Sequence, residues 1–270
     1  MATVKVFADS VKFSSGKQGP GGPGGPRGSC KGFSRSSRRR MIQRLASVRS
    51  AGLQAHFLTL TYPDASLGDE WPDWKRDVRA FRKRLMRKFP QVVGGVWRME
   101  PQPRRSEARD EYVPHFHLIV WAKAELPADF KAWARLAWYE VVGSEDPRHL
   151  RHGVDHKLLD SRRAIGAYVS KYVAKAQAGS GQEVGRCWGM FGELETDPYL
   201  EAEITASEYV LLRRLARRWL KSRKSKHGRR LRGAEVCTVF ALGAESTPFL
   251  TVLRMLDAVR PGLGHIDLSD

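Results

Sequence analysis

One short segment, Pro114–Trp121, restricts the folds open to this chain, because it has the pattern of a β-strand that carries two histidines two positions apart. Successive side chains of a strand point to opposite faces, so His115 and His117 share one face while Phe116 and Leu118 share the other. The apolar face must pack on a core, and the other face presents two imidazoles from one rigid element. Neutral imidazole is the commonest metal ligand, so the pair indicates either a divalent metal site or two ordinary polar residues on a half-exposed strand.

A carboxylate on the preceding strand bears on this choice. Residues 92–100 form a second predicted strand, interrupted by a glycine pair that indicates a bulge or a close backbone approach. The polar segment 101–111 is a predicted hairpin loop, so the two strands are expected to be antiparallel neighbours. Glu100 would then face the histidines and complete a set of two nitrogens and one oxygen, with open positions for water or a phosphate oxygen. Asp110 and Glu111, in the loop, are the alternative carboxylate ligands.

The charge of the chain favours a polyanionic partner. Its 270 residues include 47 Lys and Arg against 29 Asp and Glu, a formal net charge of +18, and a surplus of this size suits nucleic acid. No acidic residue occurs from Ser10 to Pro63, and none occurs from Arg213 to Arg232, where there are eleven basic residues. Both stretches predict phosphate-binding surfaces on amphipathic helices. The candidate DNA contacts are Arg38, Arg39, Arg40, Arg213, Arg214, Arg217, Arg218 and Lys221.

Composition divides the chain into three parts. Residues 1–32 combine a weakly alternating tip, expected to be an edge strand, with a Gly/Pro tract that has the composition of a flexible linker. Residues 33–195 hold the periodic strands and helices of one catalytic-sized domain, and residues 196–270 form a basic, mainly helical extension. The three cysteines are widely spaced and support neither a disulfide framework nor a cysteine zinc site. No apolar run is long enough to span a bilayer, so the cytoplasm is the expected compartment.

A predicted helix from Ser161 to about Gln177 carries two tyrosines, each followed one turn later by a lysine. At 3.6 residues per turn, Tyr168, Lys171, Tyr172 and Lys175 lie on one stripe. A phenol with a pKa near 10 is ionised to about one part in a thousand at pH 7, so a tyrosine nucleophile needs a cation or metal nearby. The repeated Tyr-x-x-Lys pattern supplies that cation twice. By itself, however, the stripe is more typical of an ordinary helix surface.

Taken together, these motifs resemble the His-hydrophobe-His replication initiators of rolling-circle plasmids and single-stranded DNA phages, in their two-tyrosine form. Phe57–Tyr62 looks like the first motif of that family, Pro114–Trp121 like the second and Tyr168–Lys175 like the third, in the same order and at similar spacing. Ser34–Arg40 and Arg186–Gly192 also look like flanking features of the phage and plasmid branch. The resemblance covers the whole of the expected catalytic domain.

The resemblance implies an α+β fold, in which a palm-like central antiparallel sheet holds the histidines, helices flank it and the tyrosine helix lies beside the metal. His115 and His117 would be ligands of Mg²⁺ or Mn²⁺, with Glu100 as the third ligand. No phosphate-binding loop of the Gly-x-x-x-x-Gly-Lys type occurs, so unwinding of duplex DNA is expected to come from a host helicase.

The resemblance also implies a reaction. Tyr168 and Tyr172 would be nucleophiles, with Lys171 and Lys175 as supporting cations. Attack on a phosphodiester of single-stranded or extruded origin DNA would give a 5′-phosphotyrosine and a free 3′-OH. Because phosphotyrosine conserves the bond energy, strands can later be rejoined without a nucleotide.

Three alternatives remain open at this point. A conjugative relaxase would share the chemistry but usually has three histidines and a nucleophile near its N-terminus, ahead of the histidines. A histidine-triad nucleotide hydrolase would need a third histidine at position 119, which is Ile119. A non-catalytic nucleic-acid-binding protein would need neither the histidine pair nor the paired tyrosines.

Overall fold

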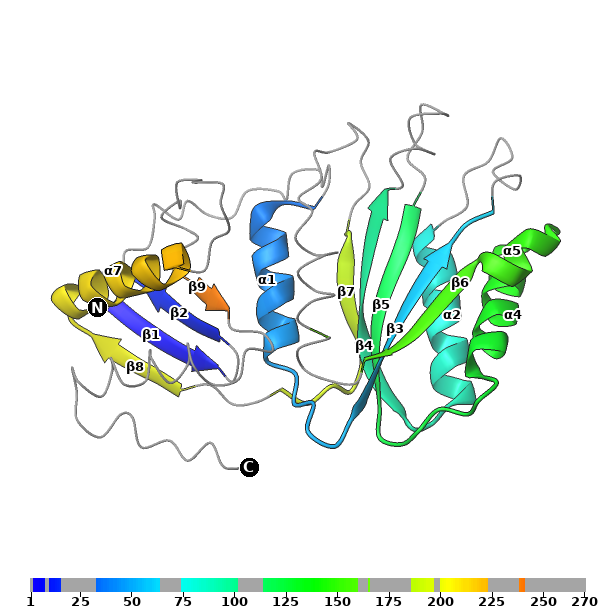
Figure 1. Cartoon of the computed structure of the whole chain (residues 1–270), viewed down its shortest axis with the longest axis horizontal. Coiled ribbons are helices and arrows are strands. Elements are labelled where there is room, and N and C mark those ends of the chain that lie inside the picture. The colour runs from blue at the N-terminus through cyan, green and yellow to red at the C-terminus, as the bar shows by residue number, and fades with distance from the viewer. Residues whose placement is uncertain are drawn as a thin grey trace. The chain divides into compact units, whose positions relative to one another are not determined.

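The computed structural model describes residues 2–7, 10–15, 33–63, 74–101, 114–159, 165, 186–196, 200–222 and 238–240. They fall into two compact units, one within Gly28–Glu195 and one that joins Met1–Arg27 to Thr196–Asp270. Each unit combines an antiparallel sheet with helices, which confirms the predicted α+β class (Figure 1). The N-terminal tip and the C-terminal region thus lie in one unit.

The larger unit is built on a five-stranded antiparallel sheet with the histidine strand at its centre. Its strand order is β6-β3-β5-β4-β7. β4 and β5 pair as antiparallel neighbours, and the register shifts between Val92 and Gly94, so the predicted pairing and bulge are both confirmed. The backbone oxygen of Phe191 lies where a Cβ on Gly94 would sit, so this position requires glycine. The strands are β3 (Gln54–Thr61), β4 (Val92–Pro101), β5 (Pro114–Ala122), β6 (Val154–Leu159) and β7 (Trp188–Gly192).

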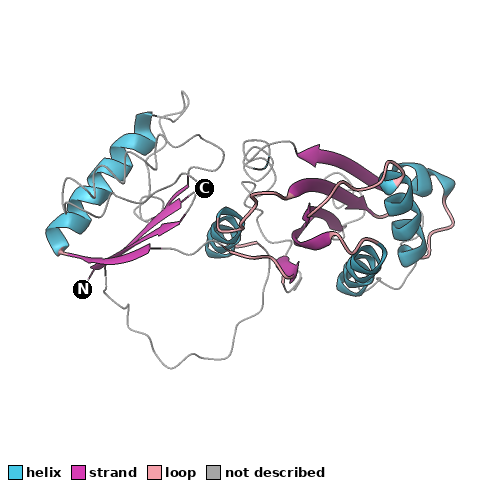
Figure 2. Ribbon diagram, turned by 90° about the horizontal axis from the view of Figure 1, so that it is seen from below, coloured by secondary structure: helices cyan, strands magenta, loops and turns pink. Residues whose placement is uncertain are grey.

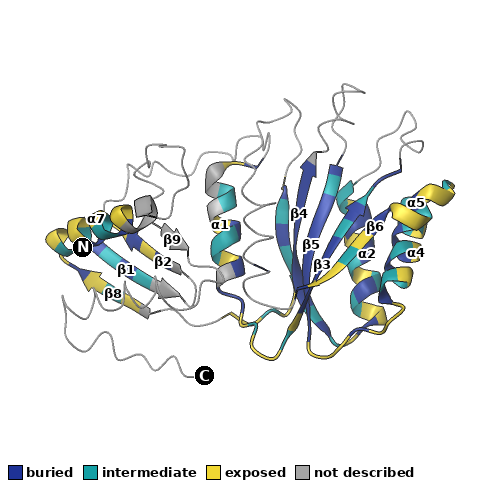
Figure 3. Cartoon of the chain, in the orientation of Figure 1, coloured by how far each residue is buried: buried dark blue, intermediate teal, exposed yellow. Residues whose placement is uncertain are grey.

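Two helices, α2 (Trp74–Lys88) and α4 (Phe130–Val142), pack on one face of this sheet (Figure 2). The apolar positions that recur along each helix form an aromatic core with the sheet, in which Phe81 meets Trp138 edge-on at 5.9 Å between ring centroids. The central strands are almost wholly buried (Figure 3). A short helix, α5 (Pro147–His152), follows α4 and has Asp146 as its N-cap.

Helix α1 (Arg35–Ala46) lies on the other side of the sheet (Figure 2). Ser34 is its N-cap and accepts a hydrogen bond from the backbone N–H of Ser37, as the sequence predicts. The indole N–H of Trp188, in β7, donates to the Ser37 hydroxyl at 2.9 Å. The start of α1 is therefore tied to the edge of the sheet.

The smaller unit has its own antiparallel sheet, in the order β8-β1-β2-β9. The tip expected to be a single edge strand forms a hairpin, and its first strand has neighbours on both sides. Helix α7 (Ala206–Ser222) buries Leu212 and Ala216. No helix in the described part of the chain is long and apolar enough to cross a bilayer. The strands are β1 (Ala2–Phe7), β2 (Ser10–Ser14), β8 (Leu200–Ile204) and β9 (Thr238–Phe240).

Candidate active site

The strand register of the larger unit brings the predicted ligands to one face. Across the β4–β5 pair, Glu100 lies directly opposite His115 and Arg98 lies opposite His117. Across the β3–β5 pair, Thr59 lies opposite His117. Residues directly opposite in an antiparallel pair point to the same face, so these five side chains form one polar group. Helices α2 and α4 pack on the opposite face.

The ring of His117 is held in place by its neighbours. Its Nδ1 lies 3.2 Å from the Thr59 hydroxyl, and its ring stacks on Phe57 with a centroid separation of 5.4 Å. When Nδ1–H donates to Thr59, the lone pair is on Nε2, which is the tautomer that binds a metal through that nitrogen. The centroids of the two histidine rings are 4.5 Å apart. The pair therefore presents two imidazoles close together, one of them fixed in orientation.

The carboxylate of Glu100 is buried next to this pair. Its Oε2 lies 3.7 Å from Nε2 of His117 and 3.1 Å from Nη1 of Arg98. Burial raises the pKa of Glu100, but the interaction with His117 and the positive charges of Arg98 and His115 outweigh it and hold the pKa below its ordinary value. Glu100 is therefore a carboxylate at neutral pH.

Arg98 is a functional residue that sequence reasoning missed. Its side chain is only 1% exposed, its guanidinium carbon lies 4.6 Å from the centroid of the Phe33 ring, and it forms an ion pair with Glu100. Strand alternation could have found it, because Arg98 precedes Glu100 by two residues and so shares its face. A basic residue in an otherwise apolar strand was the available signal.

The donor set suits a hard divalent cation. Two ligand atoms that each lie about 2.1 Å from one ion are at most about 4.2 Å apart, and the 3.7 Å between His117 Nε2 and Glu100 Oε2 meets that limit. Two imidazoles and a carboxylate also leave coordination positions open. Within the described ranges, no three His, Cys, Asp or Glu side chains already converge as a formed metal cluster.

The end of β3 next to the histidines is anchored from the helical face. The carbonyl oxygen of Thr61, which lies opposite His115, accepts a hydrogen bond from the indole N–H of Trp138 at 2.9 Å. It lies 2.8 Å from Nε2 of His149, which must be the protonated nitrogen because a carbonyl only accepts. His149 is buried in this structural role, as expected from the sequence.

The predicted nucleophiles lie outside the described residues. These are Tyr168 and Tyr172, together with Lys171 and Lys175 and the alternative ligands Asp110 and Glu111. Within the predicted tyrosine helix, only Ile165 is described, and it is helical and buried.

The predicted DNA contacts are carried by two helices. On α1, Arg40 is exposed and Arg38 half-buried. On α7, the guanidinium of Arg213 lies over the Tyr209 ring at 5.4 Å. The exposed α7 cations are Arg214, Arg217 and Arg218. The side chains of Arg39 and Lys221 lie outside the described set.

Comparison with known proteins agrees with the motifs. The family model for the replication-associated protein ORF2, also called gene 2 protein, matches residues 55–177, which include the histidine pair, Glu100 and both tyrosines. The replication-associated gene 2 protein of Pseudomonas phage Pf3 is 29% identical over 201 residues, which cover 70% of this chain and 68% of the phage protein. No solved structure matches the chain significantly. Residues 55–177 therefore belong with the replication-associated ORF2 proteins, the phage type of replication initiator that the motifs indicate.

Proposed function

We propose that this chain is a replication initiator and a metal-dependent nickase that cuts and rejoins one DNA strand through a tyrosine. The observation that carries the proposal is the strand register that sets Glu100 opposite His115 and Arg98 opposite His117 on one face of the sheet. This arrangement gathers two imidazoles, a carboxylate and a guanidinium within the family match. A structural sheet face would need none of them.

His115, His117 and Glu100 hold Mg²⁺ or Mn²⁺ in this proposal. When bound, the metal supplies positive charge that orients the scissile phosphate and offsets its developing negative charge. Thr59 sets the tautomer of His117 through Nδ1. Arg98 keeps the Glu100 carboxylate ionised and fixed in place, because its guanidinium lies 3.1 Å from Oε2.

The nucleophile in this proposal is the hydroxyl oxygen of Tyr168 or Tyr172. It attacks phosphorus, the bond between phosphorus and the 3′ oxygen breaks, and the phenol loses its proton while the 3′ oxygen gains one. The products are a 5′-phosphotyrosine and a free 3′-OH. Lys171 and Lys175 favour the phenolate, and the second tyrosine can attack a regenerated junction while the first is still esterified.

The substrate in this proposal is single-stranded or extruded origin DNA. The exposed arginines of α1 and α7 supply contacts to its phosphates. A host helicase unwinds the duplex, and the site of action is the cytoplasm of the bacterial host.

The test is a denaturing gel of the full chain mixed with single-stranded DNA from its own replicon, with Mg²⁺, Mn²⁺ or chelator. We compare wild type with Tyr168→Phe, Tyr172→Phe and the double variant, and use Tyr139→Phe on α4 as the matched control. A metal-dependent covalent adduct that is lost most fully in the double variant is expected. If wild type binds the DNA but forms no adduct and no cleaved product with either metal, the chain is a non-catalytic binding protein.

A further inference from the structure

Helix α2 carries far more positive charge than the packing of the helix requires. It has eight Lys and Arg residues against one acid, Asp77, which is buried and accepts a hydrogen bond from the Tyr62 hydroxyl at 3.0 Å. Arg79, Lys83 and Arg87 are exposed and recur every four residues. Such a spacing forms a row along the helix with a step of about 6 Å. This row lies on the helical side of the sheet, on the opposite face from the histidine pair.

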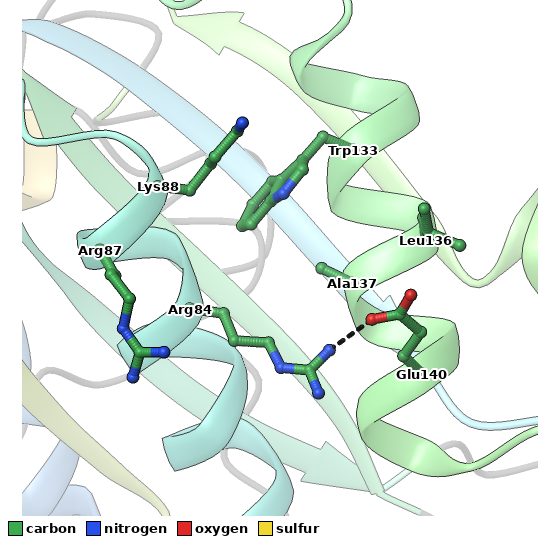
Figure 4. Close-up of a pocket in the computed structure, with 7 residues that line it drawn as sticks. All are labelled: Arg84, Arg87, Lys88, Trp133, Leu136, Ala137 and Glu140. Atoms are coloured by element: carbon green, nitrogen blue, oxygen red, sulfur yellow. Dashed lines mark hydrogen bonds and ion pairs between the residues drawn. The ribbon is translucent and has the colours of Figure 1, made fainter.

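One end of this row opens into a pocket between α2 and α4. The pocket has a volume of about 350 Å³, within the range of small-ligand sites. The Arg84–Glu140 ion pair, 2.7 Å long, crosses from one helix to the other (Figure 4). Arg87 and Lys88 also line the pocket from α2, and both are exposed. The acidic side chain of the pocket is thus already paired, whereas these two cations have no acidic partner among the described residues.

The other side of the pocket is apolar and comes from α4. The indole of Trp133 lies between the two helices (Figure 4). It packs edge-on against Phe89 with a centroid separation of 4.7 Å, yet remains partly exposed. Leu136 beside it is 48% exposed, which is unusual for a large aliphatic side chain. An accessible aromatic ring next to unpaired cations is the pattern of single-stranded nucleic-acid sites, where a base stacks and phosphates pair with the cations.

We propose that the groove between α2 and α4 is a second, sequence-independent binding site for single-stranded nucleic acid. One base contacts Trp133, Arg87 and Lys88 bind the adjoining phosphates, and Arg79 and Lys83 continue the track along α2. The regular row of cations favours a polymer of evenly repeated charges over an isolated acidic side chain of a protein partner. Because this face is opposite the histidines, the site holds a segment of strand away from the reacting phosphate and goes beyond the proposed nicking activity.

The test uses the full chain, a 12-nucleotide oligothymidylate with 5-iododeoxyuridine in place of thymidine, and chelator, so that no nicking chemistry is involved. Ultraviolet crosslinking followed by peptide mass spectrometry is expected to place an adduct on Trp133. Arg87→Gln/Lys88→Gln should reduce this adduct and lower the salt dependence of binding by about 1.4 in the slope of log K against log salt. Trp133→Leu should weaken binding about tenfold, and Trp133→Phe should retain most of it.

The matched control is Arg148→Gln/Arg151→Gln, which removes two exposed cations from α5 in the same unit. It should leave the Trp133 adduct unchanged, with circular dichroism confirming that every variant is folded. The proposal is overturned if folded wild type gives adducts only elsewhere, or if the groove and control variants weaken the Trp133 adduct equally. It is also overturned if polyglutamate binds the groove while the oligonucleotide never reaches Trp133, because the partner would then be an acidic protein.

Discussion

The two faces of the five-stranded sheet carry opposite chemistry on the same strands. On β5, Phe116 and Leu118 are fully buried against α2 and α4, while His117 points to the other face with Arg98 and Glu100. The apolar face gains stability from burial, whereas the polar face has to bury charges that are costly unless paired. Strand alternation thus lets one rigid element serve the core and the candidate site together, and the mutational response of the two faces should differ accordingly.

The largest effect is expected on the apolar face. Phe116→Ala removes a ring that is 0% exposed and lies between Tyr62 and Trp97, so it should lower the free energy of unfolding by about 3–5 kcal/mol. Urea unfolding of the larger unit, followed by tryptophan fluorescence, measures this loss. A loss below about 1 kcal/mol would mean that this face is not the core of the unit.

A smaller loss is expected from breaking the buried ion pair on the polar face. Arg98→Met leaves the Glu100 carboxylate buried without its guanidinium and should lower the free energy of unfolding by about 3 kcal/mol. The double variant Arg98→Met/Glu100→Gln should recover part of that loss, because it removes the uncompensated charge. If the double variant is no more stable than the single one, the cost of Arg98→Met comes from packing alone.

A pH effect should come from His56, which lies on the helical face opposite Val120. Burial, and then the positive charge of His156, lower the pKa of His56 from 6.5 to about 4. The unfolded chain therefore takes up the proton first as the pH falls. The contribution to stability is complete above pH 6.5 and should be lost between pH 6.5 and about 4, by about 2 kcal/mol. Urea unfolding at each pH should show this slope in wild type and a flatter profile in His56→Gln; identical profiles would contradict the assignment.

The smallest effect is expected at the surface. Arg49 and Glu195 form an ion pair 3.2 Å long, in which the two side chains are 50% and 75% exposed. Solvent screens such a pair, so Arg49→Gln should change the free energy of unfolding by less than about 1 kcal/mol. Raising the salt concentration should shrink this difference further, and a loss as large as that of Arg98→Met would show that exposure does not separate the two pairs.

Much of this sheet could be predicted from local patterns. The alternation in β5 and the aromatic and β-branched residues of β3 identified both strands, and the Gly94–Gly95 pair identified the bulge. The N-cap at Ser34 followed from the same local chemistry. Such features depend on neighbours in the sequence, which is why residue patterns predict them.

What could not be predicted depends on contacts distant in sequence. The pairing of β1 with β8 joins the two ends of the described chain, as in the Ala2–Ile204 pair, and nothing in the weak alternation of the tip indicates that partner. The ion pair of Arg98 with Glu100 is local, but the packing of Phe33 on that guanidinium requires the segment that leads into α1 to lie on the same face. The candidate metal ligands were named from the sequence, whereas the residues that hold them in place emerged only from the fold.

The most direct test of the central claim is a calorimetric titration of Mn²⁺ into the full chain without DNA. Wild type is compared with His117→Ala on the polar face and His156→Gln on the helical face, after thermal melts have shown that both variants are folded. The account predicts one Mn²⁺ site in wild type that is lost in His117→Ala and kept in His156→Gln. Binding that survives His117→Ala unchanged would contradict a metal centre at the histidine pair.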